Sequence, residues 1–358
     1  MGFRSVNDGS PTSAPRIADT VIGTGGLGTG ILLAVEGDHT IGREESRAVR
    51  LLPQKDRCKL QNVLHYVARL GEADVVPIGR VGDDDAGRQV VSELAAEGMD
   101  VSRVRTDATL PTLASYCFTY PGGDGGNLTT SESASSAVGS DDLVDVEDLF
   151  SASGERAIAV ATPEVPLAAR VELLERAGRH GARRFASFLT AEVEAAVRER
   201  LLDHVDVVSI NIDEAAAIAP RVSGGSAEQI AEAAIWHLAE SFPRLSLVVT
   251  AGANGSWVYD GTGVHHQKAI HVDAVNTAGA GDAHLAGLVL ASAWGASLVE
   301  ANHFATVLSA KSVRSADTIN ESVTAATLLR FAAALQIDLP AVCRQALETT
   351  VTHVMAGA

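Results

Sequence analysis

The chain has 358 residues, of which 46% are hydrophobic and 20% are charged, and its formal net charge at pH 7 is −17. This apolar content predicts a packed core and excludes a disordered chain, and no apolar run reaches the ~20 residues that span a bilayer. The negative charge disfavours nucleic acid and anionic membrane surfaces as partners. The three cysteines are scattered, which excludes a disulfide framework or a clustered zinc site and favours the cytoplasm; they are Cys58, Cys117 and Cys343.

The chain begins with residues 1–16, a Ser-, Pro-, Asn- and Gly-rich stretch that we expect to be a flexible leader rather than a secretory signal. After it, short β-branched runs alternate with longer amphipathic stretches. The expected strands are Ala18–Ile22, Asp74–Ile78, Arg156–Val160, Arg184–Ser187, Val205–Ile210 and Leu245–Thr250. The expected helices are Leu60–Leu70, Arg88–Glu97, Leu167–Arg179, Ala191–Leu202, Ala227–Glu240 and Asp282–Ser292. This alternation predicts βαβ units and a mostly parallel sheet between helices.

Two segments interrupt the alternation. Residues 31–59 contain a strongly charged run, and residues 112–140 contain a β stretch, Leu113–Tyr120, followed by a Gly-rich run. Long irregular pieces in a compact α/β domain are usually lids or binding loops. We therefore expect a lid here, with surface decoration as the alternative.

The run Gly23–Gly28 matches G-x-G-x-x-G directly after the first expected strand. Such a loop could hold a dinucleotide pyrophosphate, which would indicate an oxidoreductase. That fold also requires a helix after the glycines and a second strand that ends in an acidic residue, and the sequence predicts neither. The dinucleotide interpretation is therefore weak.

A stronger pattern lies at residues 276–287, NTAGAGDAHLAG. The small residues before the expected helix leave consecutive backbone amides uncovered, and with the helix dipole these amides form an anion hole. Asp282 follows in the first turn, where its carboxylate could accept the proton of an attacking hydroxyl. The alternative is an ordinary capped helix after a Gly-rich turn.

Two further pairs of signals lie upstream. Asn211 ends an expected strand and Glu214 follows in the first helical turn, which suits a hydrated Mg²⁺ near substrate phosphates, or else a helix-capping pair. The strand that ends at Thr250 runs into a turn containing Gly252 and Gly255. That turn could let a nucleotide approach the backbone, although an ordinary β-turn explains it equally well.

In this order, N-x-x-E, strand–TxGxxG and [DN]TxGAGD resemble the PfkB family of carbohydrate kinases, which have the ribokinase-like fold. The block LG…GRVGDDDAG, from Leu70 to Gly87, and the pair Pro111–Thr112 are similar to the N-terminal motifs of that family. The resemblance runs from about Ile17 to Asp317. It implies a three-layer αβα sandwich with a mostly parallel central sheet and a small β lid. The expected division is a kinase domain at 17–330 and a C-terminal helical extension at 331–358.

The resemblance implies an ATP- and Mg²⁺-dependent enzyme that transfers the γ-phosphoryl group to a hydroxyl of a sugar or sugar derivative. Asp282 would be the base, and the anion hole would consist of Gly279, Ala280 and Gly281. Mg²⁺ would be organised by Asn211 and Glu214. The nucleotide would meet Thr250, Gly252, Gly255, Thr277 and, on an expected helix at Ala301–Val313, Asn302 and Phe304. The acceptor would meet Gly28, Arg57, Lys59 and Asn62, and the lid could support a homodimer.

Three departures from the family pattern affect the acceptor. The family usually has an Asp after the first strand, where this chain reads GGLGTGILL, and RCKLQN (57–62) replaces its G-G-x-[GA]-x-N block. Asn276 stands where many members have an Asp that is linked to a monovalent cation site. The basic side chains of residues 43–59 suggest an anionic acceptor, unless they are solvated and paired with Glu44, Glu45 and Asp56. A non-catalytic binding relative and a nucleoside kinase are the alternative functions.

Overall fold

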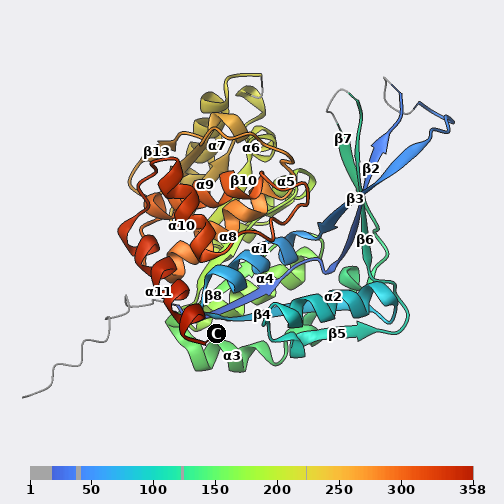
Figure 1. Ribbon diagram of the computed structural model, residues 1–358, viewed down its shortest axis with the longest axis horizontal. Helices are drawn as coiled ribbons and strands as arrows, with labels where there is room; N and C mark the ends of the chain where they lie inside the picture. The colour runs from blue at the N-terminus through green and yellow to red at the C-terminus, as the bar shows by residue number, and fades with distance from the viewer. Residues whose placement is uncertain (1–17, 38–41, 122–124, 223, 358) are drawn as a thin grey trace, which may run out of the picture.

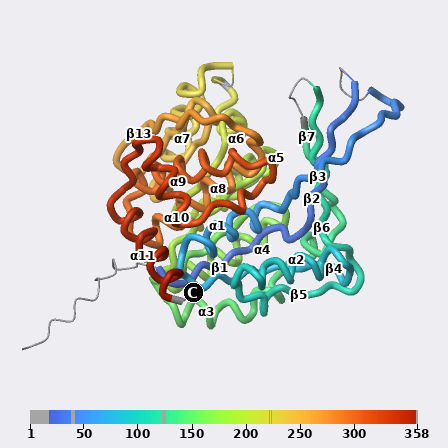
Figure 2. Tube along the Cα trace, in the orientation of Figure 1, coloured from blue at the N-terminus to red at the C-terminus, as the bar shows by residue number. Residues whose placement is uncertain are grey.

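The computed structural model describes residues 18–37, 42–121, 125–222 and 224–357, so the expected leader lies outside the described residues. A large sheet lies between two layers of helices, and a small sheet projects from one side of this body (Figure 1). The Cα trace shows the same separation of the two parts (Figure 2). Within the described ranges, we find no helix that is long and apolar enough to cross a membrane.

The large sheet has nine strands in the order β13-β12-β11-β10-β9-β8-β1-β4-β5. Neighbouring strands from β11 to β5 are parallel, whereas β12 and β13 pair antiparallel. Helices cover both faces, which is why β1 and β8 are buried along their whole lengths. The strands are β1 (Thr20–Thr24), β4 (Asp74–Gly82), β5 (Val104–Asp107), β8 (Ala157–Ala161), β9 (Arg183–Ala186), β10 (Val207–Asn211), β11 (Ser246–Thr250), β12 (Ser256–Tyr259) and β13 (Val264–Gln267).

Each face of the large sheet has its own apolar core. One core contains side chains of α1 (Lys59–Leu70), α2 (Asp85–Ala96), α8 (Ala280–Ala293), α9 (Leu298–Ser312), α10 (Ala325–Ala334) and α11 (Ala341–Gly357). The other contains side chains of α3 (Val146–Ser153), α4 (Leu167–Arg179), α5 (Thr190–Arg198), α6 (Ile212–Ile218) and α7 (Ala227–Ser241). The predicted three-layer αβα architecture is thereby confirmed. The predicted boundary at 330 falls inside α10, and α11 contributes Cys343 and Leu347 to the first core.

The small sheet is built from the two segments predicted as a lid. Its order is β3-β2-β6-β7, with β2 (Gly28–Val35), β3 (Val49–Arg57), β6 (Leu113–Thr119) and β7 (Gly125–Thr129). Strand β2 begins at the last glycine of the Gly23–Gly28 run. A strand therefore follows these glycines where a dinucleotide loop needs a helix, which removes the basis of the oxidoreductase interpretation.

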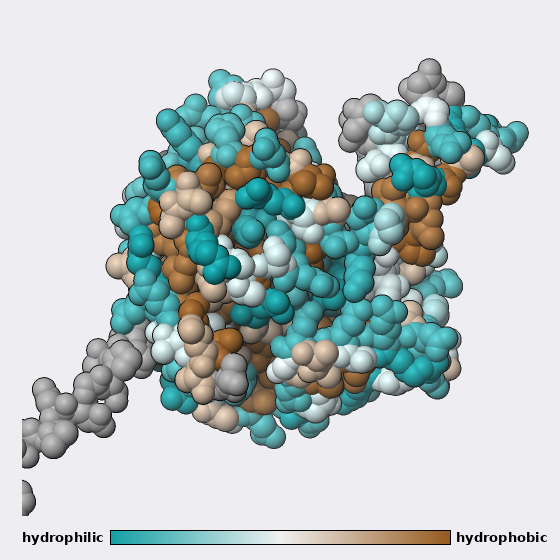
Figure 3. All heavy atoms as spheres, viewed as in Figure 1, coloured by the Kyte–Doolittle hydropathy of each residue, from teal (hydrophilic) through white to brown (hydrophobic). Residues whose placement is uncertain are grey.

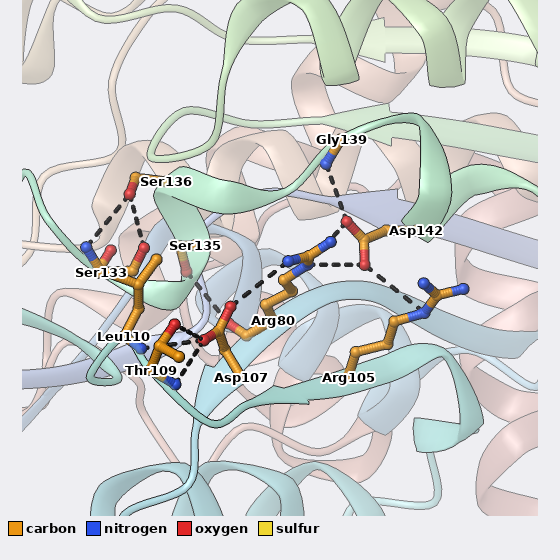
Figure 4. Close-up of polar contacts among 10 residues, drawn as sticks. All are labelled: Arg80, Arg105, Asp107, Thr109, Leu110, Ser133, Ser135, Ser136, Gly139 and Asp142. Atoms are coloured by element: carbon orange, nitrogen blue, oxygen red, sulfur yellow. Dashed lines mark hydrogen bonds and ion pairs between the residues drawn. The ribbon is translucent and has the colours of Figure 1, made fainter.

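A polar cluster fixes the segment that returns from the lid to the body (Figure 4). The Nε of Arg80, on β4, donates to both carboxylate oxygens of Asp142 at 2.9 Å. The hydroxyl of Ser135 accepts from the backbone N–H of Leu27 at 3.2 Å, just before β2 begins. These bonds join the segment after β7 to the central sheet and to the start of β2, so they hold the end of the lid that adjoins the body.

Candidate active site

The GAGD segment forms the N-terminus of α8, beside the carboxyl ends of the parallel strands. Gly279 is the N-cap residue with φ 77°, and a Cβ added there would overlap the carbonyl oxygen of Thr318. Only glycine accepts this backbone without strain. By contrast, a Cβ added at Gly281 would meet no heavy atom within 4 Å. The first turn of α8 is therefore uncovered at Gly281, where an anion could approach the backbone. The predicted contribution of Ala280 needs correction, because its N–H donates to the carbonyl oxygen of Thr277 at 3.2 Å.

The structure brings together Asp282, the predicted base, and two of the predicted acceptor residues, Asn62 and Lys59. The Nδ2 of Asn62, on α1, donates to Asp282 Oδ2 at 2.7 Å. The Nζ of Lys59, at the start of α1, lies 4.0 Å from Asp282 Oδ1. The charge of Asp282 raises the pKa of Lys59 above its usual value, so the lysine is cationic. A carboxylate, an amide and a cation thus converge at the helix N-terminus.

Glu164 is a second carboxylate at this site, and it was not predicted from the sequence. It follows β8 with φ 78°, a backbone conformation that non-glycine residues rarely adopt. Its Oε2 accepts from the backbone N–H of Lys59 at 3.3 Å. Burial raises the pKa of Glu164 to about 7, Lys59 lowers it, and Asp282 raises it further. A Glu three residues after a buried parallel strand was the signal that could have identified it.

Asp56, on lid strand β3, is the third carboxylate and was also missed as a site residue. Its Oδ2 accepts from the thiol of Cys117 at 3.2 Å. Burial raises the pKa of Asp56, and the charge of Asp282 adds to this effect. In the sequence, Asp56 lies within a basic run and was interpreted as an ion-pair partner, so only the fold reveals its position.

Two predicted acceptor contacts are occupied by other groups of the chain. The guanidinium of Arg57 pairs with Glu97 at 2.9 Å and with Glu93 at 3.2 Å, both belonging to α2 or its C-cap. The N–H of Gly28 donates to Gln61 Oε1 at 2.9 Å. The structure therefore does not offer either group to an acceptor, in contrast to Lys59 and Asn62.

Three other basic side chains of the lid segment are also paired with acids. Arg43 lies 3.8 Å from Glu44, and Arg47 is bonded to Glu45. Lys55 lies 3.8 Å from Glu321. These pairs favour the interpretation of a solvated, internally paired segment over that of an anion-binding insert.

Asn211 and Glu214 form the predicted capping pair of α6. Asn211 Oδ1 accepts from the amides of Asp213 and Glu214, and Glu214 Oε2 accepts from the Asn211 N–H at 2.7 Å. Burial raises the pKa of Glu214 to about 6, and Lys59 lowers it, which places Glu214 within the electrostatic range of the site. The described residues contain no group of three or more His, Cys, Asp or Glu that could hold a metal. The oxygen atoms of this pair fit a largely hydrated Mg²⁺, which needs few protein ligands.

The predicted nucleotide residues fall into two groups. Gly252 and Gly255 lie in a turn after β11 with φ 54° and 90°, next to Thr250 at the strand end, and Thr277 is exposed just before α8. These four stay candidates for nucleotide contacts.

Asn302 and Phe304 need correction, because both are buried in α9. The Oδ1 of Asn302 accepts from the Ser256 hydroxyl at 3.0 Å, and Phe304 packs edge-on against Trp294 with ring centroids 5.2 Å apart. Their exposed fractions are 2% and 0%. In this structure neither side chain is accessible to an adenine.

Asn276 bridges the loop before α8 and the loop after α9. Its Nδ2 donates to the carbonyl oxygen of Ala316 at 2.8 Å, and its Oδ1 accepts from the N–H of Ala278 at 3.0 Å. The amide therefore supplies a positive partner to a loop carbonyl, as a cation would do.

We expect the activity of the wild-type enzyme to differ less than about two-fold between K⁺ and Na⁺ at constant ionic strength, because the Asn276 amide already joins the two loops. Asn276→Asp removes the donor and adds a charge, so this variant should become activated by K⁺. Initial rates in matched salts test this, and activation of the wild-type enzyme by several-fold would contradict it.

Comparisons with known proteins agree with this geometry. A family model described as pfkB family carbohydrate kinase matches residues 59–325. The chain is 30% identical over 269 residues to the aminoimidazole riboside kinase of Salmonella typhimurium (strain LT2), covering 68% of this chain and 77% of that protein. Among solved structures, a ribokinase from Cryptococcus neoformans in complex with ADP matches with a TM-score of 0.73 and 19% identity, over 87% of this chain and 99% of its own. An Arabidopsis thaliana ribokinase complexed with ribose and ATP matches with a TM-score of 0.68 and 20% identity, over 90% and 100%.

Proposed function

The chain belongs to the pfkB family of carbohydrate kinases and is a phosphotransferase, and we propose that it transfers the γ-phosphoryl group of ATP to a hydroxyl of a sugar or sugar derivative. The observation that carries this proposal is the position of Asp282, within hydrogen-bond reach of Asn62 at the uncovered N-terminus of α8. A base beside an anion hole is the arrangement that phosphoryl transfer to an alcohol requires. A protein that only bound its ligands would have no use for the base.

In the proposed mechanism, the acceptor hydroxyl donates its proton to Asp282 while its oxygen attacks the γ-phosphorus. The bond from that phosphorus to the β,γ-bridging oxygen breaks, and ADP leaves. The amide at Gly281, in the uncovered turn, stabilises the charge that develops on the transferred group, and the helix dipole adds to this effect. The cationic Lys59 lies beside Asp282. Its charge offsets the repulsion between the negative phosphoryl group and the carboxylates of Asp282 and Glu164. Positioning and electrostatics of this kind supply most of the rate in phosphoryl transfer.

We propose ATP and Mg²⁺ as the cosubstrate and the metal. In the turn after β11, a Cβ added at Gly252 would meet no heavy atom within 4 Å, so the nucleotide could approach the backbone there, whereas Gly255 packs against the carbonyl oxygen of Gln267. Asn211 with Glu214 would hold the hydrated ion, which neutralises phosphate charge when bound. The chain would act in the cytoplasm, a proposal supported by the free thiols of Cys58, Cys117 and Cys343.

Glu214→Gln is expected to raise the Mg²⁺ concentration needed for half-maximal activity by about ten-fold, while kcat at saturating Mg²⁺ falls less. The variant keeps a hydrogen-bonding side chain at the α6 cap and loses the charge that would attract the ion. Mg²⁺ titrations of initial rate at fixed ATP measure the effect. Superimposable titrations of the variant and the wild type would leave Glu214 with the capping role alone.

A nucleoside kinase is the second candidate, because the chain is 30% identical to an aminoimidazole riboside kinase. One assay compares the two: ADP formation from ATP with a panel of sugars, polyols, sugar acids, sugar phosphates and nucleosides. Turnover with a free sugar supports the first candidate, and turnover restricted to nucleosides supports the second. No phosphorylation of any compound by an enzyme that binds ATP would overturn both.

The outer face of the lid supports a homodimer. The cross-strand register places Ile31 beside Tyr116 and Tyr116 beside Leu128, whereas Asp56 pairs with Gly30 and therefore points to the opposite face. Tyr116 and Leu128 are 38% and 64% exposed, and apolar groups gather over the lid (Figure 3). Contiguous exposed apolar side chains commonly mark an interaction surface.

We expect sedimentation velocity to show a dimer at micromolar concentration. Leu128→Glu should convert it to a monomer, because the dimer would bury the new charge. Lys55→Glu, a charge change on an exposed lid residue that already pairs with Glu321, is the control for lid charge. A wild-type chain that stays monomeric at high concentration would contradict the proposal.

A further inference from the structure

The glycines around the start of β2 are covered by carboxylates from two other elements. A Cβ added at Gly26 would overlap the side chain of Glu164, which follows β8. A Cβ added at Gly30 would overlap the side chain of Asp56, which comes from lid strand β3. Because Gly26 and Gly30 have no side chains, there is space beside them for the carboxylates of Glu164 and Asp56, which belong to other elements than β1. The first strand itself contributes no carboxylate here, since it is followed by GGLGTG.

Asp56 belongs to the polar inner face of the lid. Its register partner is Gly30, whose partner on β6 is Ser115, and the Ser115 hydroxyl bonds to Asn127 of β7 at 2.7 Å. The opposite face of the same sheet carries the exposed apolar side chains. Asp56 is 9% exposed, and the charge of Asp282 acts on it. The lid thus holds a buried carboxylate within electrostatic range of Asp282.

Among the described residues, Lys59 is the cation that acts on Glu164, while Asp56 and Asp282 lie within electrostatic range of the same carboxylate. Asp56 and Asp282 both raise the pKa of Glu164, after its burial, while Lys59 lowers it. The guanidinium of Arg57, which could have balanced the charge, is held by Glu93 and Glu97. An anionic acceptor placed among these groups would be repelled, whereas the hydroxyls of a neutral acceptor would find strong acceptors for their protons.

Two buried polar atoms next to these carboxylates have no hydrogen-bond partner within the described chain. They are Thr162 Oγ1, on a side chain that is 0% exposed, and Asn62 Oδ1, on one that is 3% exposed. Thr162 lies against Gly25, and Asn62 bonds to Asp282 through its other amide atom. Because buried polar groups are nearly always paired, these two atoms indicate a ligand with several hydrogen-bonding groups.

We infer that Asp56 binds a hydroxyl group of the acceptor from the lid side, and that the acceptor is a neutral polyhydroxylated compound rather than a sugar acid or a sugar phosphate. This inference rests on the proposed function and narrows its substrate class. It assigns to the lid a role that the first strand cannot perform in this chain. It also opposes the anionic acceptor suggested by the basic lid segment.

The test compares Asp56→Asn with Asp317→Asn. The first variant keeps the shape of the side chain and removes its charge. The second removes a carboxylate that bonds to the N–H of Lys55 on the same strand, outside the cluster, and so controls for loss of a lid tether. Kinetics use the neutral sugar or nucleoside of the panel with the highest kcat/KM, and thermal shifts are recorded with D-ribose, inosine, D-gluconate and ribose 5-phosphate in the absence of ATP.

We expect Asp56→Asn to raise the acceptor KM at least about ten-fold, because the hydrogen bond from the acceptor hydroxyl to the charged carboxylate is lost. The ATP KM should stay within about two-fold of the wild-type value. Asp317→Asn should leave both values near those of the wild type. An unchanged acceptor KM, or equal effects of the two variants, would overturn the role of Asp56. If the enzyme phosphorylated a sugar acid or a sugar phosphate in preference to the neutral compounds, the inference of a neutral acceptor would be overturned, and the proposed kinase function would stand. If no compound is phosphorylated or shifts the melting temperature, the proposed function fails first and the inference fails with it.

Discussion

Asp282→Asn is expected to lower kcat by about 10²–10⁴-fold while the KM for ATP stays within about two-fold of the wild-type value. The carboxylate acts on the acceptor proton in the transition state, so its loss affects turnover rather than nucleotide binding. The substitution preserves the size of the side chain and a hydrogen-bonding group for Asn62. Steady-state kinetics with both substrates varied, together with ATP binding by calorimetry, measure the two effects separately.

Asp85→Asn is the matched control for this experiment. Asp85 also lies in the first turn of a helix, α2, but its side chain is fully exposed and pairs only at the surface with Arg88. Surface pairs of this kind contribute little to stability, so this variant should behave as the wild type. If Asp282→Asn kept more than about a tenth of the wild-type kcat, Asp282 would not be the base.

Gly279→Ala is expected to lower kcat/KM by at least about 10²-fold and to weaken ATP binding. Alanine at φ 77° costs about 1–2 kcal/mol, and its Cβ would overlap the carbonyl oxygen of Thr318. Relief of that overlap must move either the loop that carries Thr318 or the first turn of α8. Because the anion hole depends on the direction of the first amides, a shift of this kind misplaces them.

Gly281→Ala is the control for the loss of a glycine from the same motif. Gly281 is helical, and a Cβ there meets nothing within 4 Å. Alanine keeps the backbone amide and improves helix propensity, so the variant should fold with at least wild-type stability and keep most of its activity. Melting temperatures and kinetics of the two variants test the pair. Equal losses of activity would show that bulk near the phosphate, rather than the backbone at residue 279, decides the outcome.

The architecture could be predicted from the sequence, and so could the residues that we propose for the catalytic end of the site. Alternation of β-branched runs and amphipathic stretches predicts a parallel sheet between helices, because the two periodicities are local properties. The GAGD segment is equally local: Gly279, Asp282 and the start of α8 lie within a few residues, so their arrangement follows from the turn and the helix. Asn62 and Lys59 were proposed as acceptor residues from the segment that replaces the family's G-G-x-[GA]-x-N block, and the structure places both beside Asp282.

The tertiary structure decided which side chains face the acceptor. Arg57 and Lys59 are two residues apart in a basic run, yet Arg57 pairs with α2 and Lys59 faces Asp282. Strand β3 ends and α1 begins between them, and this change of direction separates their side chains. Asp56 and Glu164 lie more than a hundred positions apart, and the fold brings the charge of Asp56 within electrostatic range of Glu164. Such contacts depend on pairing between distant segments, which no local pattern of residues encodes.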